Sequence, residues 1–174
     1  MRAMAEIIEM STGLSLNSAL TAYEVAEKED FSRVIINASL DGIITYDLEA
    51  RFTLWSPSME RITGVKSKDV IGRICFDVFP FLKEQGMDVA ILKSLRGEAV
   101  KSAPISFKIG ETGAQGFTEQ QNFPLFNEFG EITGGIAIVR DITDLKKNFD
   151  AVFEKNRELE TRIRDLEKKL ENLK

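Results

Sequence analysis

The chain has 174 residues, 43% of them hydrophobic, and a formal net charge of −5 at pH 7. That length supports one modest core with an appendage, and the negative charge gives no reason to expect nucleic acid as a partner. Histidine is absent, so histidine-ligated haem, histidine-based metal sites and histidine-dependent triads are excluded, and we expect neither a metal nor an enzyme activity. A single cysteine and no apolar run of membrane-spanning length predict a cytoplasmic protein without membrane insertion.

Residues 1–30 form the first predicted part, a polar N-terminal helical extension. After a break at residues 11–13, apolar residues recur at spacings of four and three, which predicts an amphipathic helix that enters the next domain. Its apolar positions are Leu16, Leu20 and Tyr23, continued less regularly by Phe31 and Val34.

Residues 31–143 alternate short strands, turns and short helices. The segments GIITYD and RFTLWS predict a hairpin, and three further strands follow the helices, the last being ITGGIAIVRD. One short helix begins at a Ser56 cap. A second short helix, in GMDVAILKSLRGE, is predicted to have Val89, Leu92 and Leu95 on one face. This order predicts an α+β domain of antiparallel hairpins with helices packed on one face.

Residues 144–174 are rich in charge and contain no glycine or proline. Apolar residues and one asparagine recur at alternating spacings of four and three, which predicts a coiled coil; the alternative is a solitary charged surface helix. Leucine at d and Asn156 at an a position favour a parallel two-stranded coil, and hence a homodimer, with Lys155 reaching Glu160 across the partner chain. The predicted interface consists of Leu145, Phe149, Val152, Asn156, Leu159, Ile163, Leu166, Leu170 and Leu173.

Only Asp141, Ile142 and Thr143 separate the last predicted strand from this helix. A flexible linker at this place would absorb any movement of the sheet. We therefore predict that these three residues relay a signal, with Thr143 as a helix cap.

Residues 31–143 resemble a PAS domain, the sensory module of many bacterial and archaeal signalling proteins. The resemblance rests on FSRVIINASLDGIITYDLEARFTLWSPSMERITGVKSKDVIGR at the front and NEFGEITGGIAIVRDITDLKK, with its Asp-Ile-Thr signature, at the back. It implies a five-stranded antiparallel sheet with short flanking helices, which can enclose a ligand. In this family the flanking helices commonly dimerise, and a following coil leads to an output domain such as a histidine kinase or a cyclase.

The function predicted from this pattern is a sensory module that dimerises and passes a signal through its coiled coil to an output domain outside this chain, as in two-component systems. One alternative is a passive homodimerisation scaffold without a ligand. A second is a flavin-binding photosensory or redox PAS domain that uses Cys75.

The flavin alternative arises because Gly72, Arg73 and Cys75 match the motif around the reactive cysteine of light-oxygen-voltage domains. The remainder of that motif is not matched. Thr118 and Val139 stand where that branch has amide side chains for the flavin ring, and unmatched polar edges of a buried ligand cost about 1–3 kcal/mol each. A small, partly buried Cys75 in a helix turn, without a photochemical role, is the favoured interpretation.

We expect no cofactor, although an unidentified small molecule remains an alternative to a filled core. The alternation of residues along the strands suggests which polar side chains face inward. A shift of one residue would exchange the two faces of a strand, so the pattern leaves the choice of face open. The candidate ligand-binding residues are Thr45, Trp55, Gln120, Asn122 and Arg140. Arg140 would suit an organic acid, or it would simply pair with a surface carboxylate.

Overall fold

The computed structural model describes residues 16–171, and the chain divides into two units between Ser39 and Leu40. Helix α2 (Leu16–Ala38) is the described part of the first unit. It continues past residue 30, where we placed the end of the extension, because no glycine or proline interrupts it. No helix within residues 16–171 is long and apolar enough to cross a membrane.

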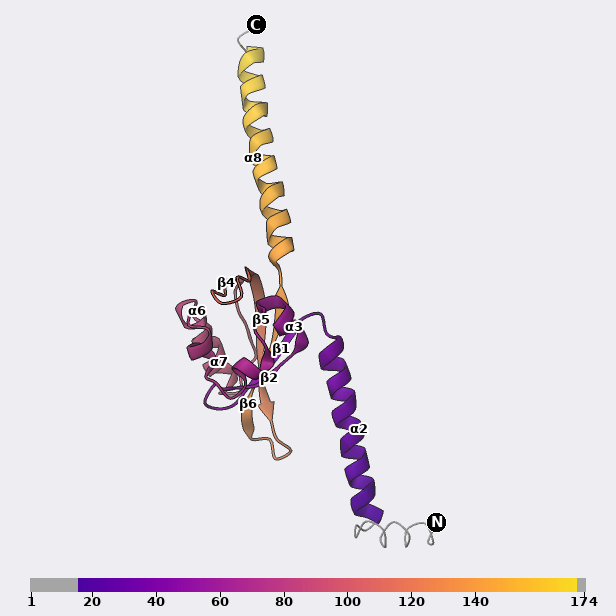
Figure 1. The fold of residues 1–174 in the computed structure, drawn as a ribbon. Helices are drawn as coiled ribbons and strands as arrows, with labels where there is room; N and C mark the ends of the chain where they lie inside the picture. Colours follow the sequence, from indigo (N-terminus) through magenta and orange to yellow (C-terminus); the bar gives the residue numbers. More distant parts are fainter. Residues whose placement is uncertain (1–15, 172–174) are drawn as a thin grey trace. The chain divides into compact units, whose positions relative to one another are not determined.

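An antiparallel sheet forms the centre of the second unit (Figure 1). Its strands follow the order β2-β1-β6-β5-β3, and β4 also pairs with β5. The strands are β1 (Gly42–Tyr46), β2 (Phe52–Trp55), β3 (Val100–Lys101), β4 (Ile105–Lys108), β5 (Gln115–Phe126) and β6 (Ile132–Asp141). The predicted α+β class is confirmed, as is the predicted order of two strands, several helices and then the remaining strands.

The sheet has six strands where we expected five, because the strand at one edge is divided. The two-residue strand β3 pairs with Gln121 and Asn122 of β5, and β4 pairs with residues 115–118 further along the same strand. Pro104 lies between them and has no N–H to donate to a ladder, so the edge is interrupted there.

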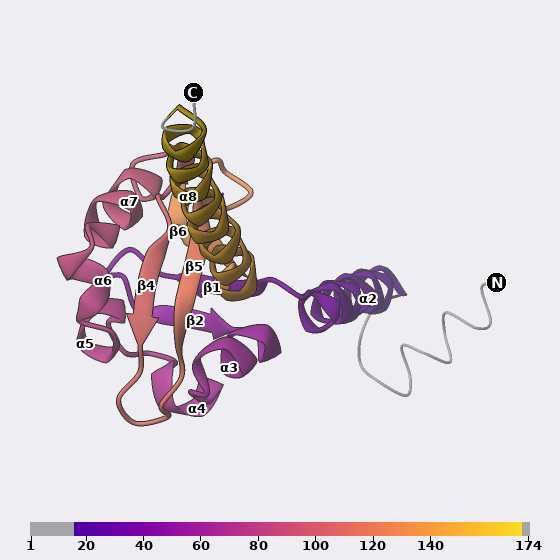
Figure 2. The same cartoon turned by 90° about the horizontal axis from the view of Figure 1, so that it is seen from above.

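Five short helices follow the hairpin and pack with the inner face of the sheet in one core (Figure 2). They are α3 (Pro57–Thr63), α4 (Ser67–Val70), α5 (Cys75–Val78), α6 (Phe81–Glu84) and α7 (Met87–Ser94). Helix α3 begins as predicted, because the Ser56 hydroxyl accepts a hydrogen bond from the Met59 N–H at 3.4 Å. The same hydroxyl accepts from the Ile43 N–H at 2.9 Å and so joins the helix to β1.

The predicted face of helix α7 was wrong. Val89 and Leu92 are exposed, whereas the buried face consists of Met87, Ala90, Ile91 and Ser94. Both sets have helical spacing, and the smaller side chains of Ala90 and Ser94 allow the helix to approach the sheet closely. The polar Ser94 at the end of the buried face made this face difficult to identify from the sequence.

Helix α8 (Thr143–Glu171) follows β6 directly. Its side chains from Lys147 to Lys169 are exposed. Seven large apolar side chains of α8 are exposed, which are Leu145, Phe149, Val152, Phe153, Leu159, Ile163 and Leu166.

Two titratable groups lie within the core. Cys75 and Tyr46 are 0% and 1% exposed, and burial raises the pKa of each to about 12, from ordinary values of 9.0 and 10.0. Each group therefore stays protonated in the folded protein at pH values where the unfolded chain would ionise.

Close backbone approach fixes the position of β6 against β1. A Cβ atom added at Gly134 would collide with the carbonyl oxygen of Tyr46, and one added at Gly135 would collide with the Tyr46 ring. The two glycines therefore allow the bulky Tyr46 to lie beneath the sheet.

Gly134→Ala is expected to lower the free energy of unfolding by about 1–3 kcal/mol, because the colliding atom is backbone and cannot swing aside. Urea unfolding followed by circular dichroism measures this loss. Gly110→Ala is the matched control: a Cβ at Gly110 meets nothing within 4 Å, so a change below about 0.5 kcal/mol is expected. Equal losses in the two variants would contradict the close approach.

The free energy of unfolding is also expected to fall as the pH rises from about 9 to about 12. Above its ordinary pKa of 9.0 for Cys75 or 10.0 for Tyr46, each group loses its proton in the unfolded chain while the folded protein keeps it. Ionisation of each group therefore favours unfolding by about 1.4 kcal/mol per pH unit above that value. Urea unfolding at a series of pH values would show a shallower decline for Cys75→Ala. Identical slopes in the variant and the unmodified protein would contradict a protonated, buried thiol.

Candidate functional site

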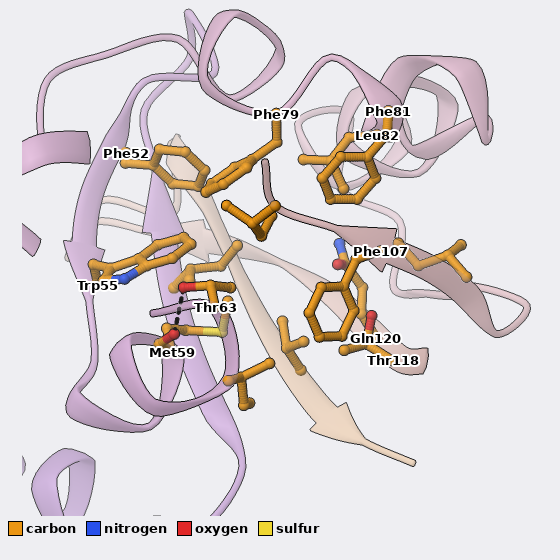
Figure 3. A pocket seen from close by; sticks show the side chains of 15 residues that line it. Phe52, Trp55, Met59, Thr63, Phe79, Phe81, Leu82, Phe107, Thr118 and Gln120 are labelled. Atoms are coloured by element: carbon orange, nitrogen blue, oxygen red, sulfur yellow. Dashed lines mark hydrogen bonds between the residues drawn. The ribbon is translucent and has the colours of Figure 1, made fainter. Parts of the chain in front are cut away.

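A cavity of about 50 Å³ lies between the inner face of the sheet and the short helices (Figure 3). Most of its lining is apolar, and no charged side chain contributes to it. The lining residues are Ile44, Phe52, Trp55, Met59, Ile62, Thr63, Phe79, Phe81, Leu82, Ile105, Phe107, Ile109, Thr118, Gln120 and Val139.

Packed aromatic rings form one wall of the cavity. The rings of Trp55 and Phe79 stack with centroids 5.5 Å apart, and Phe52 meets the Trp55 ring edge-on at 5.0 Å. Phe81 lies 6.0 Å from Phe79. The indole N–H of Trp55 donates to the carbonyl of Val65 at 3.1 Å, so this ring is fixed at its polar end as well.

Three polar side chains reach the cavity. The Thr63 hydroxyl donates to the Met59 carbonyl within α3 at 2.7 Å and is thereby satisfied (Figure 3). Thr118 and Gln120 come from β5 on the opposite side. The Thr118 hydroxyl has no hydrogen-bond partner among the described residues, so its polar capacity is available to a bound molecule.

A buried chain of hydrogen bonds leads from Gln120 away from the cavity. The side-chain amides of Gln120 and Asn122 are joined at 3.0 Å, and Asn122 contacts the Tyr46 hydroxyl at 3.1 Å. Tyr46 contacts the Ser94 hydroxyl at 2.7 Å, which in turn donates to the Ile91 carbonyl at 2.7 Å. The chain therefore connects strand β5 with helix α7 through the interior of the domain.

The five predicted ligand-binding residues divide between the two faces of the sheet. Trp55 and Gln120 line the cavity, and Asn122 is buried next to Gln120. Thr45 lies on the outer face, where its hydroxyl meets that of Thr53 at 2.6 Å. Arg140 is also on the outer face.

Arg140 forms a two-pronged ion pair with Asp41, with bonds of 3.1 and 2.8 Å. These hydrogen bonds raise the pKa of the guanidinium group further. This is the surface pairing that we considered as the alternative for Arg140.

Sequence reasoning did not identify Tyr46 and Ser94 of the buried hydrogen-bond chain, because no local pattern indicates that two hydroxyl groups 48 residues apart are in contact.

Cys75 begins helix α5 and is fully buried. It is not among the residues that line the cavity. Its raised pKa, caused mainly by burial, keeps the thiol protonated and therefore weakly nucleophilic at neutral pH.

The connection between β6 and α8 is bonded to strand β5. The Ile142 N–H donates to the Phe117 carbonyl at 2.9 Å, and the Thr143 hydroxyl accepts from the Phe117 N–H at 3.0 Å. The Asp141 carboxylate accepts from the Thr143 N–H at 2.8 Å. Asp141 thus supplies the bond at the start of α8 that we had assigned to Thr143, whose hydroxyl instead holds the neighbouring strand.

The predicted coil interface is exposed along α8 as far as its side chains are described. Leu170 and Leu173 lie outside the side chains that the structure describes. Phe153, which sequence reasoning omitted, stacks on Phe149 with ring centroids 6.4 Å apart and extends the apolar stripe at its base. Its e position in the heptad explains the omission, because only a and d positions were assigned to the interface.

Comparison with known proteins places this arrangement in a family. The transcriptional activator RocR of Bacillus subtilis (strain 168) is 23% identical over 128 residues, which cover 71% of this chain and 27% of RocR. The chain thus spans about a quarter of the length of that relative.

Solved structures share the fold. An RNA-binding light-oxygen-voltage receptor superposes with a TM-score of 0.61 at 21% identity, over 79% of this chain and 39% of that one. A domain of a sensory box sensor histidine kinase/response regulator from Geobacter sulfurreducens superposes with a TM-score of 0.54 at 14% identity, over 67% of this chain and 96% of that one. At these identities the likeness extends to the fold alone.

Residues 36–147 match the family described as the PAS fold. They include the whole sheet, the lining of the cavity and the first turn of α8. Because this match extends over more than half of the chain, the protein belongs to the PAS fold family, whose members resemble sensory modules of signalling proteins.

Proposed function

We propose that this chain is the sensory part of a dimeric signalling protein, with the cavity as its input and helix α8 as its output. The observation that carries this proposal is the adjacency of two residues on β5. Thr118 lines the cavity, and its neighbour Phe117 holds the start of α8 through both of its backbone polar groups.

This adjacency supports mechanical coupling. A molecule that entered the cavity would press on Thr118 and Gln120, and β5 would shift or twist in response. The Phe117 N–H and carbonyl move with the strand and carry Ile142 and Thr143 with them. Because no flexible linker intervenes, the displacement reaches α8 as a tilt or rotation, and a dimer interface with two packings would amplify it.

Helix α8 supports the dimeric state. Seven large apolar side chains on one isolated charged helix would leave a long apolar stripe in water, which a second helix would cover. The ion pairs along the helix, Lys155–Glu158 and Arg157–Glu154, are exposed and therefore weak, so Lys155 is available to Glu160 of a partner chain. The single Asn156 in the stripe favours a parallel pair in one register.

The flavin alternative has less support. Drug-sized and cofactor pockets measure roughly 300–1,000 Å³, far above the 50 Å³ of this cavity. Cys75 does not line the cavity, so a flavin placed there would not lie against its sulfur. The passive-scaffold alternative predicts the same dimer without coupling, and it is separated from our proposal by the second experiment below.

The downstream partner is proposed to be an output domain outside this chain. RocR is a transcriptional activator, and the Geobacter sulfurreducens protein is a sensor histidine kinase/response regulator. Either type of output would follow a dimeric coil.

Leu159→Glu is expected to dissociate the dimer, because it places a charge at the centre of the apolar stripe. Sedimentation velocity at micromolar concentration would then show a shift from dimer to monomer. Thr161→Glu introduces the same side chain at the outward f position of the heptad and should leave the dimer intact. A monomer for the unmodified chain would contradict the proposal, as would equal behaviour of the two variants.

Gly116→Ala tests the coupling. A Cβ at Gly116 would collide with the Thr143 hydroxyl, so the methyl group should move the start of α8 without altering the stripe. With spin labels at Lys168→Cys in a Cys75→Ala background, double electron–electron resonance should show the distance between the two helices changed by about 1–2 Å or more.

Gly110→Ala is again the control and should reproduce the unmodified distance, since its methyl group meets nothing. Circular dichroism verifies that each variant is folded. An unchanged distance in a folded Gly116→Ala dimer would leave the passive scaffold as the better description.

A further inference from the structure

The buried hydrogen-bond chain behind the cavity has more contacts that need a hydroxyl proton than it has hydroxyl protons. Three contacts involve only hydroxyl donors: Ser94 to the Ile91 carbonyl, Tyr46 to Ser94, and Tyr46 to the Asn122 carbonyl oxygen. The two hydroxyl groups carry one proton each. One of the three contacts must therefore receive its proton from elsewhere.

Two directions of the chain satisfy the hydroxyl protons. In one, Ser94 donates to the Ile91 carbonyl, which also accepts from the Leu95 N–H at 3.0 Å, and the Ser94 oxygen accepts from Tyr46. The other, in which Ser94 donates to Tyr46 and Tyr46 to Asn122, is disfavoured because it leaves the Asn122 Nδ2 group buried without an acceptor. In the first direction Tyr46 has no proton left for Asn122, and the contact at 3.1 Å needs a donor from the amide. A half-turn of the Asn122 amide about its last side-chain bond exchanges its oxygen and nitrogen and places Nδ2 against the Tyr46 hydroxyl.

This half-turn also moves the unpaired donor from a sealed position to the wall of the cavity. With the carbonyl oxygen toward Tyr46, the Asn122 Nδ2 group is sealed from solvent and lacks any partner among the described residues. A buried donor without an acceptor is costly, whereas an acceptor with a free lone pair is better tolerated. Turned around, Nδ2 donates one proton to Tyr46 and the other to the amide of Gln120.

The Gln120 amide must turn as well, because its contact with Asn122 at 3.0 Å now requires an acceptor. Its carbonyl oxygen faces Asn122, and its Nε2 group is left without a protein partner. Gln120 lines the cavity beside Thr118. The hydroxyl chain that begins at Ile91 thus sets the polarity of the cavity wall and makes it a hydrogen-bond donor.

We propose that the cavity binds a small uncharged carbonyl compound, whose oxygen accepts a hydrogen bond from Nε2 of Gln120. This inference rests on the proposed function only in taking the cavity as the input. An uncharged ligand follows from the absence of charged residues in the lining, since a buried charge needs a partner. At about 10–15 Å³ for each water-sized position, 50 Å³ admits on the order of three to five non-hydrogen atoms.

Three probes of one shape test the proposal. Butanone carries the carbonyl, 2-methyl-1-butene replaces the oxygen with an apolar methylene group, and propionate carries a charge. Titrations of the unmodified protein, followed by the methyl NMR signals of the cavity residues Ile44 and Val139, should show butanone binding at least roughly fivefold more tightly than the alkene. Propionate should not bind.

The same titrations with Gln120→Met should markedly reduce the preference for butanone, because methionine keeps the length of the side chain and removes the Nε2 donor, which leaves only the Thr118 hydroxyl. Gln121→Met is the matched control, since Gln121 is exposed on the other face of the same strand. Tighter binding of the alkene or of propionate would overturn the proposal, and so would the absence of butanone binding.

If Gln120→Met does not fold, a measurement on the unmodified protein tests the proposal instead. In the unmodified protein the Asn122 NH₂ protons should give strong nuclear Overhauser effects to the Tyr46 ring, and their absence would overturn the assigned direction. Both measurements are independent of dimerisation. A failure to bind butanone leaves the coil experiments standing, and a failure of those experiments leaves the ligand class standing.

Discussion

The attachment of the α8 start to Phe117 is the interaction on which the rest of this molecule depends. A strand that simply ran into a helix would leave the helix free to swing about Ile142. Two hydrogen bonds from neighbouring residues to one residue of β5 remove that freedom. Gly116 is required beside Phe117, because a side chain there would occupy the position of the Thr143 hydroxyl. The direction of α8 is therefore defined by β5 as much as by β6.

Strand β5 can serve this purpose because it is paired along both edges. It pairs with β6 from Thr118 to Phe126, and on its other side with β3 and β4. Its inward residues alternate with its outward ones, so one strand presents Thr118 and Gln120 to the cavity while its backbone holds the start of α8. The sequence shows the alternation in this strand, but the bonds from Phe117 to Ile142 and to Thr143 join residues far apart in the chain, 26 positions for Thr143, and leave no local pattern.

The elements that were predicted correctly are those with a strongly periodic sequence or with clear capping or turn residues at their ends, such as the GIITYD hairpin, the Ser56 cap and the last strand. The sequence did not reveal which of the alternating residues of β6 face the core. Ile136 and Ile138 are its most apolar residues, and an inward orientation for them would also have brought Arg140 inward. Instead Ala137 and Val139 are buried. The Tyr46 ring occupies the space above Gly135, so the small residues of β6 must face the core.

The two walls of the cavity differ in how they can respond to a bound molecule. On the helical side, Phe79 and Phe81 border both the cavity and an outer groove that also contains Arg73 and Lys108. Phe79 lies between the four-residue helices α5 and α6, and Phe81 begins α6. On the other side, β5 cannot slide along β6 without breaking the bonds that start α8. It can only move together with β6, and any such joint movement carries Thr143 and the apolar stripe with it. In the function that we propose, a ligand would enter beside the helices and the signal would leave through the sheet on the opposite wall, so exchange of the ligand would not release helix α8.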